Sequence, residues 1–122
     1  MKLAQFKKKY KRFEGLAIWI SRRLRTRLAI DVIILNRNFL EQSTEPQIRF
    51  ALWHEVGHFK NGLIKDWLIG IKQSERQAQH FAILKMKQEG YSFNDLFCFE
   101  INYRLFEKYG LTAKEYIKEM RK

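Results

Sequence analysis

The sequence is poor in the residues that build disulfide-rich, fibrous or membrane-spanning proteins. Its 122 residues include a single cysteine, Cys98, so no disulfide can form within the chain. One proline and six glycines exclude collagen-like and low-complexity chains. The longest apolar runs, residues 15–20 and 32–35, are far too short to cross a bilayer. These absences predict a soluble cytoplasmic protein with no membrane partner.

Apolar residues are plentiful by comparison, at 46% of the chain. That content suffices for one hydrophobic core, and the length predicts one domain over residues 1–122. The three tryptophans, Trp19, Trp53 and Trp67, are expected in this core, because buried aromatics dominate core energetics. A platform on which nucleic-acid bases stack is the less favoured alternative.

Positive charge is concentrated at the start of the chain. Residues 1–27 hold ten Lys/Arg and one acidic residue, a net charge of +9, whereas residues 28–122 carry a net charge of only +2. Such a basic region can attract a nucleic acid or an acidic protein partner. A solvated arm that only aids solubility is the plain alternative.

Hydrophobic spacing and turn signals predict an α+β domain with a small N-terminal sheet or hairpin packed on helices. Asp31 is expected to mark the solvent side of the second strand, and residues 15–35 as one long bent strand are an alternative. A loop over residues 36–43 and a short connection through Asp66 are also expected. The predicted helices are 3–13, 44–61, 74–89, 92–109 and a short one from 112; the predicted strands are 15–20 and 28–35.

The central predicted helix carries the chemistry. Thr44 and Gln47 form a capping-box pattern at its start. Its last two turns contain an HExxH motif, in which His54 and His58 lie four residues apart and so project from one face. Two imidazoles at this spacing can hold one metal ion. Glu55, rotated by about 100° on the helix, can accept a proton from an attacking water and return it to a leaving amine.

A catalytic zinc ion needs a third protein ligand and an open position. The candidates are Asp66, Glu75 and His80. Glu75 is favoured because it lies in the first turn of the next predicted helix, where Gln79 follows on the same face. Gln79 can hydrogen-bond the outer nitrogen of His54 and fix its tautomer. The pattern predicts one Zn²⁺ per chain, although two imidazoles and a carboxylate also suit other divalent metals.

Residues 28–88 resemble the ImmA/IrrE-type metallopeptidases, of the gluzincin kind. The resemblance rests on the HExxH motif and on Glu75, Ala78, Phe81 and Ala82 in the following helix. It implies a minimal zincin-like fold with His54, His58 and Glu75 as zinc ligands, Glu55 as catalytic base and an edge strand along the substrate cleft. Gln79 and Gln77 depart from the family pattern, which has Asn and Glu at these positions.

Two functional hypotheses follow. The first is a zinc-dependent endopeptidase whose substrate is a protein; the resemblance implies a DNA-binding transcriptional repressor. Residues 28–35 could then bind an extended substrate as an added strand. The alternative is a non-catalytic zincin-fold regulatory or nucleic-acid-binding module that uses the basic region at residues 1–27.

Overall fold

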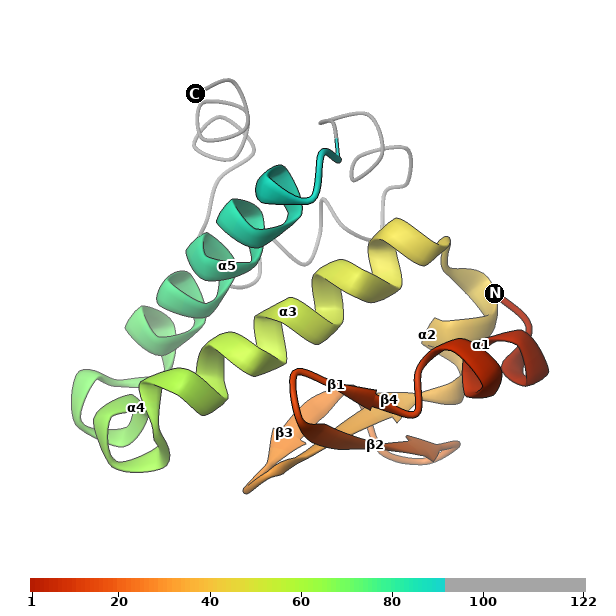
Figure 1. Cartoon of the computed structure of the whole chain (residues 1–122). Coiled ribbons are helices and arrows are strands. Elements are labelled where there is room, and N and C mark those ends of the chain that lie inside the picture. Colours follow the sequence, from red (N-terminus) through yellow and green to blue (C-terminus); the bar gives the residue numbers. More distant parts are fainter. Residues whose placement is uncertain (92–122) are drawn as a thin grey trace.

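A computed structural model describes residues 1–91 of the chain, and it has an α+β architecture (Figure 1). The predicted helices over 92–109 and from 112 lie outside the described residues. The elements are α1 (Leu3–Lys9), β1 (Arg12–Phe13), β2 (Leu16–Ser21), β3 (Arg27–Ala29), β4 (Val32–Asn36), α2 (Arg37–Gln42), α3 (Glu45–Asn61), α4 (Leu63–Ile69) and α5 (Ile71–Gln88).

The strands form one mixed sheet of order β1-β2-β4-β3. β2 and β4 are parallel, while β1 pairs with β2 and β3 pairs with β4 in the antiparallel sense. β3 is therefore an edge strand. The described helices lie to one side of the sheet in Figure 1, with α3 and α5 side by side.

The core lies between the inner face of the sheet and the helices. Its largest fully buried side chains come from α1, β4, α2, α3 and α5, and α1 contributes Phe6. Burying each such side chain stabilises the fold by about 1.5–3 kcal/mol. The largest fully buried apolar side chains are Phe6, Ile33, Leu35, Leu40, Ile48, Leu52, Ile83 and Met86.

The predicted strand over 28–35 is wrong in one respect, because it is two strands joined by a reversal. β3 ends at Ala29, and Ile30 and Asp31 form the turn before β4. Ile30 has φ of 57°, a backbone conformation that β-branched residues rarely adopt. Sequence rules therefore gave no turn signal here, and the alternative of one bent strand over 15–35 is wrong as well.

Three further boundaries differ from the predictions. The first helix stops at Lys9, and Phe13 belongs to β1. The predicted loop at 36–43 contains α2, whose N-cap Asn36 accepts a hydrogen bond from the backbone N–H of Phe39 at 3.1 Å. The predicted connection through Asp66 is helical and forms part of α4.

The expectation that all tryptophans are buried is also wrong. Trp53 is 6% exposed and packs edge-on against Phe13, but Trp19 and Trp67 are 63% and 81% exposed. Trp67 belongs to α4, a short helix that lies at one end of the α3–α5 pair (Figure 1). The composition could not separate these positions, because burial depends on which face of an element a residue occupies.

Candidate metal centre

Helix α3 positions the HExxH residues. The predicted capping box is present: the Thr44 side chain accepts from the Gln47 N–H, and the Gln47 side chain accepts from the Thr44 N–H at 2.9 Å. This fixes where the helix begins. The core-facing residues Ile48, Leu52 and Val56 are buried, and His54 and Glu55 are each only 6% exposed. Burial of such polar groups requires partners.

Two glycines reverse the chain so that α5 returns antiparallel to α3. Gly62 and Gly70 have φ of 86° and 85° with extended ψ, a combination that only glycine adopts readily. They enclose the short helix α4. α5 then begins at Ile71, earlier than the predicted start at residue 74, and places Glu75 beside the end of α3.

Helices α3 and α5 pack closely at Gly57, a glycine within α3. A Cβ built at Gly57 would lie 3.1 Å from the Cα of Ala78 and 3.2 Å from a ring carbon of Phe81. A larger residue would push α5 away from α3. The glycine therefore sets the separation at which Glu75 and Gln79, on either side of Ala78, can reach the histidines.

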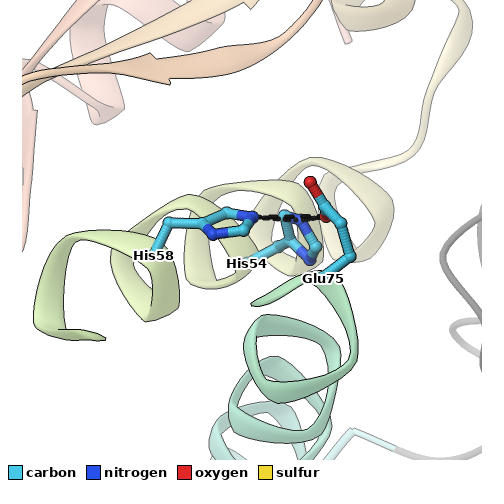
Figure 2. A group of neighbouring side chains, drawn as sticks. All are labelled: His54, His58 and Glu75. Carbon is cyan, nitrogen blue, oxygen red and sulfur yellow. Dashed lines mark hydrogen bonds and ion pairs between the residues drawn. The ribbon is translucent and has the colours of Figure 1, made fainter. Parts of the chain in front are cut away.

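The three predicted ligands converge on one point (Figure 2). Oε2 of Glu75 lies 2.7 Å from Nε2 of His54 and 3.2 Å from Nε2 of His58. The two Nε2 atoms are 3.2 Å apart. The three atoms form a triangle, with His54 buried and the other two residues partly exposed.

This triangle fits a tetrahedral metal site. Bonds of about 2.0–2.1 Å to imidazole and carboxylate ligands place those ligand atoms about 3.4 Å from one another in a tetrahedron. The observed separations are slightly shorter, so small side-chain movements suffice to admit an ion. The site can therefore hold a metal ion through two nitrogens and one oxygen.

A hydrogen-bonded support orients the two imidazoles. Nδ1 of His54 lies 2.9 Å from Oε1 of Gln79, as predicted; when Nδ1 carries the proton and donates it to this oxygen, the Nε2 lone pair is available to a metal ion. Nδ1 of His58 lies 3.1 Å from Oγ of Ser74. This role of Ser74 could not be predicted from the sequence, because Ser74 was expected at the very start of the helix over 74–89, whereas α5 begins at Ile71.

The negative charge of Glu75 is stabilised by the two imidazoles beside it. Burial alone would raise the pKa of Glu75, but hydrogen bonds from His54 and His58 outweigh burial and lower it to about 2. The carboxylate is therefore ionised over the physiological pH range, as a metal ligand must be.

Glu55 lies beside this triangle but has a different environment. Burial raises the pKa of Glu55, while the nearby imidazoles and a backbone hydrogen bond from Leu28 oppose that rise. A carboxylate with a raised pKa holds a proton more readily, which suits a general base that must also act as an acid. Leu28 belongs to β3, so this contact brings the sheet edge next to Glu55.

Of the other candidate ligands, His80 is not part of the group. His80 is exposed on α5, and Asp66 belongs to α4 with a side chain outside the described part of the structure. Within residues 1–91, His54, His58 and Glu75 are the group of metal-ligating side chains that converges.

Comparisons with protein-family models, with curated proteins and with solved structures give no match. The resemblance to ImmA/IrrE-type metallopeptidases therefore stays a prediction drawn from the motif residues. Among the described helices, none is long and apolar enough to span a membrane.

Proposed function

We propose that this protein is a zinc-dependent endopeptidase with a minimal zincin-like fold, in which His54, His58 and Glu75 hold one zinc ion. The observation that carries the proposal is the convergence of their three ligand atoms beside the buried carboxylate of Glu55. Two histidines and one glutamate are a donor set of catalytic zinc sites, which keep a further position open for substrate or water.

Each residue then has a defined task. A zinc ion held here would lower the pKa of a water molecule and polarise a peptide carbonyl. Glu55 accepts the proton of the attacking water and delivers it to the leaving amine. Gln79 and Ser74 keep the imidazole rings oriented, so the two Nε2 atoms remain directed at one point.

The position of β3 favours a peptide substrate over a small molecule. β3 is a sheet edge, and the backbone N–H of Leu28 that bonds Glu55 faces away from β4, the strand with which β3 pairs. An extended peptide that paired with this edge would pass directly beside Glu55. The substrate class is therefore a protein with an accessible extended segment, and the family resemblance makes a DNA-binding repressor the first candidate.

The decisive test uses zinc-loaded protein and a peptide library derived from proteome digests, with cleavage read by mass spectrometry. Glu55→Gln should retain zinc and lose cleavage by about 10²-fold or more, because the proton acceptor is removed while the ligands stay. Glu41→Gln, on the exposed side of α2, is the matched control and should cleave normally.

Undiminished cleavage by Glu55→Gln would refute the assigned mechanism. If zinc-loaded wild-type protein cleaved no peptide in the library, the non-catalytic regulatory alternative would be favoured instead.

A further inference from the structure

The two faces of the sheet differ in character. Along β2, Ile18 and Ile20 pack against the core, whereas Trp19 between them is 63% exposed. Because side chains alternate across a strand, Trp19 lies on the face away from the helices. Figure 1 shows that the described helices lie on the opposite side.

A row of paired residues crosses this open face. Trp19 of β2 pairs with Ile34 of β4, which pairs with Arg27 of β3. Paired residues share a face, so an exposed indole and an exposed guanidinium lie on either side of Ile34. Ile34 is buried but does not belong to the core cluster, consistent with its place on the outer face.

Three arginines come directly after the strand that carries Trp19. Arg22, Arg23 and Arg25 follow β2, and all three are exposed. Within residues 1–91 these three arginines have no acidic partner. The charge is therefore available to a phosphate backbone.

The loop that carries the arginines is anchored to the sheet. Oγ of Ser21 accepts hydrogen bonds from the backbone N–H groups of Arg23 and Leu24 at 3.3 and 3.0 Å. Nδ2 of Asn36 donates to the carbonyl of Leu24 at 2.8 Å, and the N–H of Asn36 donates to Oγ1 of Thr26 at 3.1 Å. The backbone is thus fixed at the ends of β2 and β4 while the guanidinium groups face solvent.

We infer that this open face binds single-stranded nucleic acid, a property beyond peptide hydrolysis that needs neither a metal nor Glu55. Trp19 stacks on an unpaired base, and the arginines at 22, 23, 25 and 27 contact the phosphates on either side. Charge alone would also attract an acidic protein. An exposed indole beside arginines favours a ligand with flat aromatic faces and a phosphate backbone, and a single strand presents both.

The test measures fluorescence anisotropy of labelled oligo-dT and oligo-rU of about 20 nucleotides, long enough to cover a sheet-sized site, over a series of salt concentrations. Trp19→Ala should weaken binding by about 5- to 150-fold, the loss of one stacked base. Trp67→Ala is the matched control: it removes another exposed tryptophan, from α4, and should leave affinity unchanged.

A second pair of variants tests the charge. Replacing Arg22, Arg23 and Arg25 by Gln should reduce the slope of log affinity against log salt by about 2, since each phosphate contact to a single strand contributes about 0.7. Lys60→Gln combined with Lys65→Gln, at exposed positions of α3 and α4, should leave the slope unchanged. The two oligonucleotides show whether DNA or RNA is preferred.

Three results would overturn the inference. They are absence of binding to either oligonucleotide at low salt, equal losses for Trp19→Ala and Trp67→Ala, and displacement of the oligonucleotide by poly-glutamate as effective as by unlabelled oligonucleotide. The last result would assign the surface to an acidic protein. Retained binding by Trp19→Phe, with an unchanged circular dichroism spectrum, would support stacking.

Discussion

Helix α5 presents two glutamates to α3, and their surroundings differ. Glu89, which caps the end of α5, receives hydrogen bonds from Nε and Nη2 of Arg49 at 2.7 and 2.5 Å and from Nε1 of Trp53 at 2.9 Å. These donors keep their protons at any physiological pH. Glu89 therefore forms an ion pair with Arg49 that joins the two helices.

Glu75, near the start of α5, faces two imidazole nitrogens. Each nitrogen can present a proton or a lone pair, and the two Nε2 atoms lie 3.2 Å from each other as well as close to the carboxylate. If both carried protons, the two N–H groups would repel, whereas a shared cation satisfies all three atoms at once. The comparison teaches that lone-pair donors, rather than the carboxylate itself, distinguish a metal site from a structural ion pair.

The sharpest test of this difference is to neutralise each glutamate in turn. Glu75→Gln should lower zinc affinity by more than about 100-fold, because loss of a ligand costs at least as much as loss of the groups that support one. Glu89→Gln should leave zinc affinity unchanged. Competition with a chelating dye measures both; equal losses would contradict the distinction.

The support of His54 gives the next largest effect. Gln79→Ala should reduce zinc affinity by about 10- to 100-fold, since the tautomer and ring orientation of His54 are no longer fixed. Gln77→Ala, at an exposed position two residues earlier on α5, serves as the control and should bind zinc normally. A wild-type affinity in Gln79→Ala would show that the hydrogen bond has no role in binding.

The close contact between α3 and α5 at Gly57 lies along the helix pair that both glutamates join. Gly57→Ala should lower the free energy of unfolding by about 1–3 kcal/mol through overpacking against Ala78. The higher helix propensity of alanine offsets about 1 kcal/mol of this loss. Urea denaturation measures the change, and Lys60→Ala, an exposed position of the same helix, is the control. Greater stability in Gly57→Ala would mean that α5 moves aside without cost.

The smallest expected effect belongs to the structural pair. Burial tends to raise the pKa of Glu89, but its hydrogen bonds with Arg49 and Trp53 outweigh burial and lower it. A folded-state pKa below the unfolded value gives stability that is complete above the unfolded pKa and is lost as pH falls through the folded one. Glu89→Gln should cost about 1 kcal/mol at pH 7 and less under acid. Urea denaturation of metal-free protein at pH 7 and at about pH 3, below the ordinary carboxyl range, measures the loss of stability in the variant. An equal loss of stability at the two pH values would contradict the lowered pKa of Glu89.

The residues of the candidate site could be located from the sequence because helical spacing fixes their geometry. His54 and His58 share a face whenever α3 is helical, and the capping box at Thr44 announced that helix. Gln79 follows Glu75 by one turn, so its hydrogen bond to His54 could be anticipated. The contact of Leu28 with Glu55 could not, because it depends on how the sheet edge packs on α3.

The misassigned segments share a physical cause. α2 and α4 are short helices, for which periodicity gives few repeats to recognise. The turn at Ile30 adopts a conformation that its side chain disfavours, so local preference pointed to a continuous strand. Exposure of Trp19 follows from the strand pairing, and composition alone does not contain that information.

X-ray absorption at the zinc edge of the purified, zinc-loaded protein tests the central claim most directly. We predict one zinc per chain with two imidazole nitrogens and carboxylate oxygen at about 2.0–2.1 Å, and loss of the imidazole signal in the double variant His54→Ala, His58→Ala. Stoichiometric zinc with no imidazole in its coordination sphere, or no bound zinc, would contradict the account.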